Sequence, residues 1–213
     1  MLDLSIGELD SLVHKAYRGA GFSWGLAQEA GASAAWLAMH GLPSGQMFAQ
    51  LVPVIDGVAS ATLTPAMRNA EQWRGSHAHL CPVITGAALS DFQLNELGAE
   101  SLLVVRQVLQ PAILLPFICK LGADIEVRVA GAEYLCSRHG VQQAAQGSQS
   151  GLQAHDVTLA PSTRQAAPQP LQQRASIDKS SFEVLQQYAH RTYVPATESS
   201  RLAGAGAGLL DND

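Results

Sequence analysis

Two short segments of this 213-residue chain concentrate side chains that could bind or transform a ligand. The first segment runs from Arg18 to Gly25 and includes Gly21, Ser23 and Trp24. Arg18 could pair with an anion, while Ser23 and the first N–H groups of a following helix add donors. A packed corner between two helices, with Trp24 filling the core, would use the same residues. An anion pocket and a structural corner therefore both remain open.

The second segment is the end of the chain, from residue 191 onward. Its glycines would let backbone N–H groups approach an anion closely, and Arg201 suits a carboxylate or phosphate. Its acidic side chains could hold a hard cation or a cationic substrate. The alternative is a solvated tail, because a dinucleotide-binding loop would need a preceding strand and a following helix. We expect the tail to be docked, and the candidate ligand-binding residues here are Arg191, Tyr193, Glu198, Arg201, Gly204, Gly206, Gly208, Asp211 and Asp213.

Weaker patterns concern metal binding and nucleophilic catalysis. His77, His79 and Cys81 would share one face of a strand, and this ligand set suits zinc, but a fourth ligand is missing. A loop that enters a strand explains them as well. Cys119 and Cys136 lie in apolar runs, where a buried, unreactive thiol is the usual finding. The sequence carries no common nucleotide, hydrolase or zinc-protease motif, so we predict no cofactor and no metal.

Composition excludes several classes of protein. The chain is 47% hydrophobic and carries 13 basic against 18 acidic residues, for a net charge of −5. The basic residues never form a run, so neither nucleic acid nor an anionic membrane is an expected partner. The longest apolar stretch, residues 111–119, is half a membrane span. Three cysteines at no framework spacing and a start without a basic secretion signal predict a cytoplasmic protein with reduced thiols.

Helical patterns dominate the first 75 residues. Ser5 and Glu8 form a capping box before a helix that ends near residues 19–21. Further helices are expected over residues 23–40, 44–52 and 64–73. Pro53 ends the helix over residues 44–52, and Thr64-Pro65 is typical of a helix start. Gly25 and Gly31 weaken the second helix unless they mark a close approach.

Short apolar runs follow and predict strands over residues 80–85, 101–108, 112–118, 125–129, 134–137 and 157–160, with a helix over 90–97. Residues 142–170 are rich in Gln, Ser, Ala and Pro and predict an exposed loop insertion. A final helix is expected over residues 180–191. This order favours an α+β fold: one domain over 1–213, with a helical part (1–75), a mainly antiparallel sheet (76–178), and a C-terminal helix with a Gly-rich tail (179–213).

Both end segments resemble a bacterial family carried only as a domain of unknown function. The resemblance rests on residues 15–31 with Trp36, Leu37 and Gly41, and on residues 191–213. It implies a bacterial cytosolic protein and transfers no catalytic residue.

Two functions follow from these patterns. The leading hypothesis is a small-molecule metabolic enzyme, or a subunit of one, that binds an anionic or amino-acid-like ligand through arginine side chains. Its pocket would lie between the N-terminal helix pair and the sheet. The alternative is a non-catalytic ligand-binding or assembly protein whose tail docks on a second copy. In both cases we expect a homo-oligomer.

Overall fold

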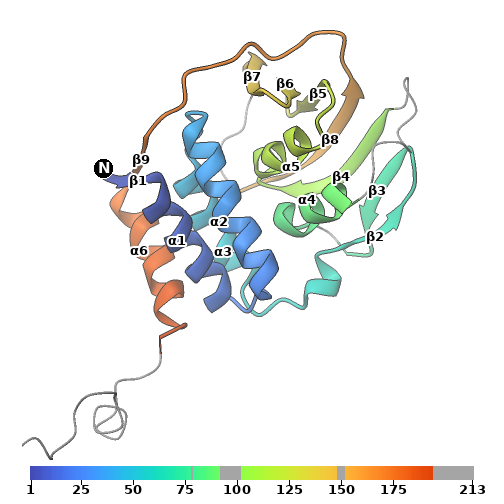
Figure 1. The fold of residues 1–213 in the computed structure, drawn as a ribbon. Helices are drawn as coiled ribbons and strands as arrows, with labels where there is room; N and C mark the ends of the chain where they lie inside the picture. Colours follow the sequence, from blue (N-terminus) through green and yellow to red (C-terminus); the bar gives the residue numbers. More distant parts are fainter. Residues whose placement is uncertain (78, 92–101, 148–151, 194–213) are drawn as a thin grey trace, which may run out of the picture.

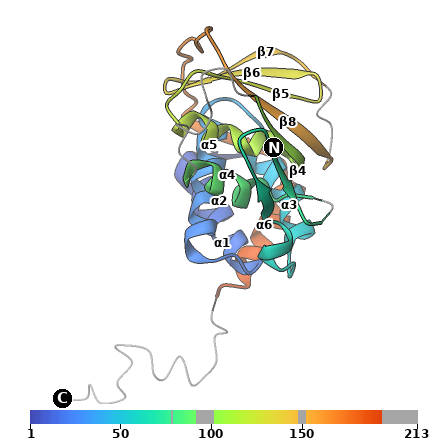
Figure 2. The same cartoon turned by 90° about the vertical axis from the view of Figure 1, so that its right-hand side faces the viewer.

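The computed structural model describes residues 1–77, 79–91, 102–147 and 152–193. In this part of the chain, a layer of helices packs beside a sheet, and two shorter helices lie between them (Figure 1). The turned view shows the same order of layers, with the sheet at one end (Figure 2). The helical layer consists of α1 (Ile6–Gly19), α2 (Trp24–Met39), α3 (Ser44–Ile55) and α6 (Lys179–His190).

The main sheet has seven described strands in the order β2-β3-β4-β8-β5-β6-β7. Neighbouring strands are antiparallel except β3 and β4, which are parallel. A separate pair, β1 (Leu2–Ser5) with β9 (Arg174–Ile177), borders the helical layer. The strands of the main sheet are β2 (Pro65–Arg68), β3 (Gln72–Gly75), β4 (Leu103–Leu109), β5 (Ile125–Val129), β6 (Ala132–Ser137), β7 (Gly140–Ala145) and β8 (Ala154–Pro161).

Helices α4 (Pro82–Asp91) and α5 (Leu115–Lys120) fill the space between the two layers. A 3₁₀ turn (Ser60–Thr62) follows α3, and another (Pro111–Leu114) leads into α5. Buried side chains from both layers and from α4 and α5 form one continuous hydrophobic core. The α+β class and the arrangement of N-terminal helices before a mainly antiparallel sheet are therefore confirmed.

The expected ends of the first two helices are also confirmed. Ser5 and Glu8 make the capping box of α1, in which each side chain binds the other residue's backbone N–H. The side chain of Ser23 accepts a hydrogen bond from the N–H of Leu26 at the start of α2. Gly41, with φ of +77°, ends α2, because its left-handed backbone lets the N–H of Leu42 reach the carbonyl of Leu37. α6 covers the range expected for the last helix to within a residue at each end.

Two expectations in the N-terminal part were wrong. α3 does not stop at Pro53 but continues to Ile55, because only the last turn lies beyond the proline and Ile55 is buried. The helix expected over residues 64–73 is the β2–β3 hairpin. Its turn is set by Asn69, whose side chain accepts hydrogen bonds from the N–H groups of Glu71 and Gln72.

Two runs expected to be strands are helical. Residues 82–85 of the first run begin α4, and residues 112–118 form the 3₁₀ turn and most of α5. Most residues of α4 and α5 are buried, so neither helix shows the alternation of polar and apolar positions that would mark it. The strands expected at 101–108, 125–129 and 134–137 match β4, β5 and β6 closely over their described residues.

The insertion expected over residues 142–170 contains sheet structure. Residues 142–145 belong to β7, and the run 157–160 lies in β8, which pairs with both β4 and β5 inside the sheet. Residues 143–147 are exposed, as expected. In the expected helix over 90–97, residues 90 and 91 end α4, and the others lie outside the described part of the chain.

Candidate functional site

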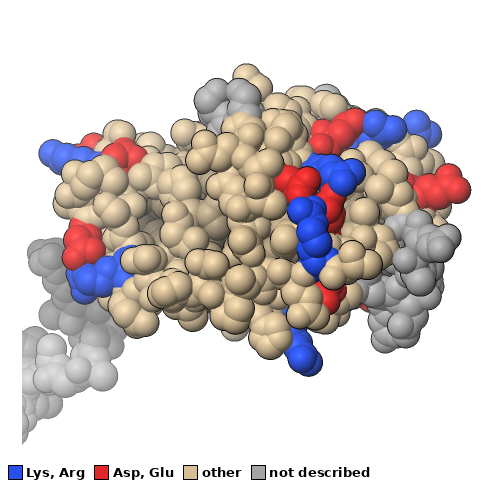
Figure 3. Space-filling model, turned by 90° about the horizontal axis from the view of Figure 1, so that it is seen from above, with Lys and Arg blue, Asp and Glu red and all other residues tan. Residues whose placement is uncertain are grey.

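A cavity of about 430 Å³ opens where α2 ends, α3 begins and β9 passes beside them. We call it the α3 pocket. The Gly41 turn and Pro43 direct the chain from one helix into the next, and β9 closes the side of the pocket. Seen from the end at which α2 stops, charged side chains form a stripe just right of the centre, and the surface immediately left of this stripe shows few of them (Figure 3). The lining residues are Met1, Ala38, Gly41, Leu42, Pro43, Ser44, Gln46, Gln172, Arg174, Ala175 and Ser176.

The first turn of α3 offers unused hydrogen-bond donors. Its N-cap is Pro43, whose side chain makes no capping bond. The N–H of Ser44 reaches the carbonyl of Leu42, and the N–H of Met47 reaches that of Pro43. Within the described part of the chain, the N–H groups of Gly45 and Gln46 make no hydrogen bond. A helix start of this kind attracts anions through these donors and through the helix dipole.

Two side chains of this turn have buried oxygen atoms without a partner. Ser44 is 2% exposed, and its Oγ makes no hydrogen bond. Oε1 of Gln46 is also buried and makes no hydrogen bond. Buried polar atoms are nearly always satisfied in folded proteins, and leaving one unpaired costs about 1–3 kcal/mol. An unpaired hydroxyl beside unused N–H donors is therefore typical of a site whose ligand supplies the missing partner.

Arg174 provides the positive charge of the α3 pocket. It lies on β9, paired across the ladder with Ser5 of β1, and its guanidinium forms an ion pair with Asp3. Its second contact with Asp3 is a hydrogen bond of 3.2 Å from Nη2 to the backbone carbonyl. The side chain stays 56% exposed, so the guanidinium can also contact a ligand. No other charged side chain lines the pocket among the described residues. The arrangement suits a small anion.

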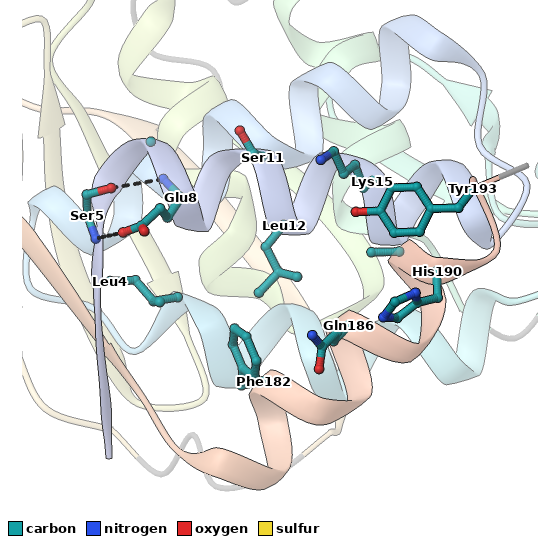
Figure 4. A pocket seen from close by; sticks show the side chains of 12 residues that line it. Leu4, Ser5, Glu8, Ser11, Leu12, Lys15, Phe182, Gln186, His190 and Tyr193 are labelled. Carbon is teal, nitrogen blue, oxygen red and sulfur yellow. Dashed lines mark hydrogen bonds between the residues drawn. The ribbon is translucent and has the colours of Figure 1, made fainter. Parts of the chain in front are cut away.

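A larger groove of about 660 Å³ lies between α1 and α6 (Figure 4). Leu4, Leu12 and Phe182 give it an apolar floor, and Lys15 and Tyr193 stand at one end, 5.7 Å from the Nζ to the ring centre. Ser5 and Glu8 at the other end already bind each other. None of the unpartnered buried atoms found in the described residues belongs to a residue lining this groove. We therefore place the candidate site at the α3 pocket.

The first sequence-predicted segment forms a corner between helices. The guanidinium of Arg18 lies 4.5 Å from the ring centre of Trp24 and donates a hydrogen bond to the carbonyl of Phe22. Gly21 has φ of +95° in the turn. Trp24 does not fill the core as the structural alternative expected. It is 70% exposed and meets the ring of His14 edge to face.

The second segment is described only at its start. Arg191 forms an ion pair with Asp56, at 2.7 Å, and lies over the ring of Tyr188. Tyr193 lies beside His190 and Lys15 at the end of the α1–α6 groove. Neither residue reaches the α3 pocket. The candidates Glu198, Arg201, Gly204, Gly206, Gly208, Asp211 and Asp213, and with them the expected docking of the tail, lie outside the described residues.

The residues of the weak metal-binding and nucleophile patterns differ in how far they are buried. His77 and His79 are exposed, whereas Cys81 is buried, and none of these three residues lies in a described strand. Among the described residues, no group of three or more His, Cys, Asp or Glu could hold a metal. All three cysteines are free and buried, and burial raises the pKa of Cys81 to about 11. A thiol with that pKa is protonated near neutral pH and is a poor nucleophile.

Sequence reasoning did not single out Ser44, Gln46 or Arg174. The helix stop at residues 40–43 marks the turn between α2 and α3, and a Pro-Ser helix start is visible in the sequence. Nothing in the sequence shows that β9 passes beside this turn. The pocket therefore depends on a contact between segments about 130 positions apart.

Residues 4–76 match a family described as "Protein of unknown function (DUF3726)". The N-terminal motif of the expected resemblance lies inside this range, so an uncharacterised domain family is confirmed there. The C-terminal motif lies outside the match. No curated protein matches the sequence. No helix among the described residues is long and apolar enough to cross a membrane.

Several solved structures resemble this protein at low sequence identity. A malate dehydrogenase from Pyrococcus horikoshii OT3 has a TM-score of 0.50 and 9% identity, over 69% of this chain and 51% of that one. A malate dehydrogenase from Entamoeba histolytica has a TM-score of 0.46 and 11% identity, over 89% of this chain and 61% of that one. A sulfolactate dehydrogenase from Methanocaldococcus jannaschii has a TM-score of 0.49 and 9% identity, over 70% of this chain and 52% of that one. The chain spans between half and three fifths of these proteins. Likeness to the Pyrococcus enzyme shows a related fold alone.

Proposed function

We propose that this protein binds a small organic anion of the carboxylate class in the α3 pocket and serves as a small-molecule metabolic enzyme or a subunit of one. The observation that carries the proposal is the buried, unpartnered hydroxyl of Ser44 at the uncapped start of α3. A carboxylate oxygen would accept hydrogen bonds from this hydroxyl and from the N–H groups of Gly45 and Gln46.

Arg174 supports a carboxylate over a neutral ligand. Its guanidinium fork matches the two oxygens of a carboxylate, and hydrogen bonds to charged groups contribute about 1.5–3 kcal/mol each. The pocket volume of about 430 Å³ falls within the usual range for small-molecule sites. Among the described residues, no serine or cysteine is hydrogen-bonded to a histidine ring, so the proposal concerns binding and names no reaction.

The related fold of a malate dehydrogenase adds a reason to include malate among the ligands tested. Because that likeness concerns the fold alone, malate is one probe beside acetate and succinate, not an assigned substrate. All three carry the carboxylate that the α3 pocket is proposed to bind.

The test is calorimetric titration of the full chain with acetate, succinate and malate, against chloride at matched ionic strength. Ser44→Ala should weaken carboxylate binding about tenfold or more, because one hydrogen bond to a charged group is lost. The same change should not lower the melting temperature of the ligand-free protein, because it removes an unsatisfied buried hydroxyl. Arg174→Gln should weaken binding by a similar factor.

Arg138→Gln is the matched control, since Arg138 is exposed and lies outside the α3 pocket. It should leave carboxylate binding unchanged. If no carboxylate binds, or if Ser44→Ala lowers stability without affecting binding, the Ser44 hydroxyl has a structural role and the proposal is wrong.

A further inference from the structure

A second polar cavity, of about 330 Å³, lies on the main sheet where β3, β4 and β8 are neighbours. We call it the β4 pocket. These strands lie on the side of the molecule away from the α1–α6 groove (Figure 1). The residues that line it are Gln72, Arg74, Gly75, His77, Leu80, Arg106, Gln107 and Asp156. None of them lines the α3 pocket.

The pairing of β3 with β4 brings two arginines to the same pocket. β3 and β4 are parallel, with Trp73 beside Val105, and both of these residues are buried. Arg74 and Arg106 are the next residues along these two strands, and both are exposed and line the β4 pocket. Like charges at neighbouring positions of a sheet repel each other and destabilise it. Such a pair is typical of a site that receives a negative charge.

Asp156 neutralises only one of these arginines. β4 carries a bulge between Val105 and Val108, so that Arg106 and Gln107 together face Asp156. Nη1 of Arg106 lies 2.6 Å from Oδ2 of Asp156. The backbone N–H and the side-chain amide of Gln107 both donate to Oδ1, at 3.0 and 3.2 Å. The Asp156 carboxylate thus accepts three hydrogen bonds from two adjacent residues of β4.

The ionised form of Asp156 is favoured by these contacts. Burial acts to raise its pKa, but the hydrogen bonds from Arg106 and Gln107 outweigh burial and lower the pKa below its ordinary value. Arg74 makes no ion pair with any described residue. His77 also lines this cavity. Within the described part of the chain, no carboxylate pairs with Arg74, so the β4 pocket keeps a positive charge there.

The backbone at the bulge is strained. Gln107 has φ of +53°, in the left-handed region that residues other than glycine rarely adopt. Its carbonyl accepts a hydrogen bond from the N–H of Leu80, which fixes the loop after β3 against the bulge. Bulges of this kind redirect side chains and occur preferentially beside binding sites. Here the bulge brings Arg106 and Gln107 to the same rim of the cavity.

We propose that the β4 pocket binds the phosphoryl group of a small molecule between Arg74, Arg106 and His77. One guanidinium fork is enough for a planar carboxylate, whereas donors from three side chains suit a tetrahedral oxyanion. Arg74 supplies the charge that no described carboxylate pairs with, and Asp156 holds Arg106 in place. This site is separate from the α3 pocket and does not depend on the function proposed there.

The experiment uses the full chain and two probes, inorganic phosphate and glycerol phosphate, each titrated by calorimetry against chloride at matched ionic strength. Arg74→Gln should weaken binding of both probes at least tenfold while the far-ultraviolet spectrum and melting temperature stay close to those of the original protein. Arg174→Gln in the α3 pocket should leave phosphate binding unchanged. Tighter binding of the ester than of inorganic phosphate would identify a phosphorylated metabolite as the ligand.

Arg138→Gln controls for general electrostatics, because it also removes one exposed guanidinium. An equal loss of phosphate binding in Arg74→Gln and Arg138→Gln would overturn the proposal, and so would the absence of binding by either probe. A loss in Arg174→Gln alone would place the oxyanion in the α3 pocket and would also contradict it.

Discussion

At the scale of single residues, side chains at helix starts fix α1, α2 and α6. Asp178 is the N-cap of α6, and its carboxylate accepts hydrogen bonds from the hydroxyls of Ser180 and Ser181 and from the N–H of Ser181. The hydrogen bond from Ser180 is the main cause, with those from Ser181, that lowers the pKa of Asp178 to about 2. This cap is confined to one turn, and none of its residues lines either proposed site.

The cap predicts a pH dependence of stability. A folded-state pKa below that of the unfolded chain, about 3.9, contributes stability that is fully present above pH ~4 and lost as the pH falls towards ~2. Asp178→Asn keeps an acceptor oxygen but cannot titrate there. The melting temperature of the original protein should exceed that of Asp178→Asn at neutral pH, and the difference should shrink through this window.

Thermal unfolding monitored by circular dichroism across the acid range measures this effect. Glu183→Gln, which removes an exposed carboxylate from the same helix, is the control. A difference between the original protein and Asp178→Asn that stays constant from neutral to acid pH would contradict the assigned cause.

Residue types predicted the caps but not the sites. Ser5, Glu8 and Ser23 are recognisable because a cap and the group it binds lie within three positions. Ser44 is unusual only because nothing binds its hydroxyl, and a sequence does not show which polar atoms lack partners. Arg74 and Arg106 come to one pocket only through the pairing of β3 with β4.

At the scale of elements, the contact between α1 and α2 depends on a small residue. A Cβ added at Gly31 would lie 2.8 Å from the backbone carbonyl oxygen of Asp10 and 2.3 Å from its Oδ1. A Cβ at Gly25 on the same helix would meet nothing within 4 Å. Of the two glycines that weaken this helix in the sequence, Gly31 marks a close helix–helix approach, and Gly25 lies in open space.

This contrast predicts opposite effects of one substitution. Gly31→Ala should destabilise the protein by about 1–3 kcal/mol, because the two helices must move apart or strain. Gly25→Ala should leave stability unchanged or raise it by up to ~1 kcal/mol, because alanine favours the helix. Urea unfolding of both variants gives the two free energies. Equal effects would mean that α1 and α2 pack less closely than described.

Elements were predicted well where one face meets solvent. α1 shows helical spacing, and β5 alternates between buried and exposed positions at its second half. α4 and α5 lie between the sheet and the helical layer, so burial on nearly all sides removes the periodicity that separates helix from strand. The β2–β3 hairpin was missed because Thr64 and Pro65 imitate a helix start, whereas Asn69 directs the chain into a turn.

At the scale of the whole molecule, the α3 pocket joins the N-terminal helices to β9, a segment near the other end of the described chain. The class of fold could be predicted from the order of patterns along the sequence. The pocket expected between the helix pair and the sheet stays a prediction, and the proposed α3 pocket lies elsewhere, beside the β1–β9 pair, whose pairing the sequence does not reveal. The proposed ligand is an anion, as expected from the sequence, but Arg174 would bind it instead of Arg18, Arg191 or Arg201.

The most direct measurement of the central claim is a nuclear magnetic resonance titration of the ¹⁵N-labelled full chain with succinate. Carboxylate binding at the start of α3 predicts progressive, saturable shifts of the amide signals of Gly45 and Gln46, with smaller changes along α6 and β5. Ser44→Ala should weaken the same titration. Shifts that leave Gly45 and Gln46 unchanged, or that centre on residues of the α1–α6 groove such as Lys15 and Tyr193, would contradict an anion site in the α3 pocket.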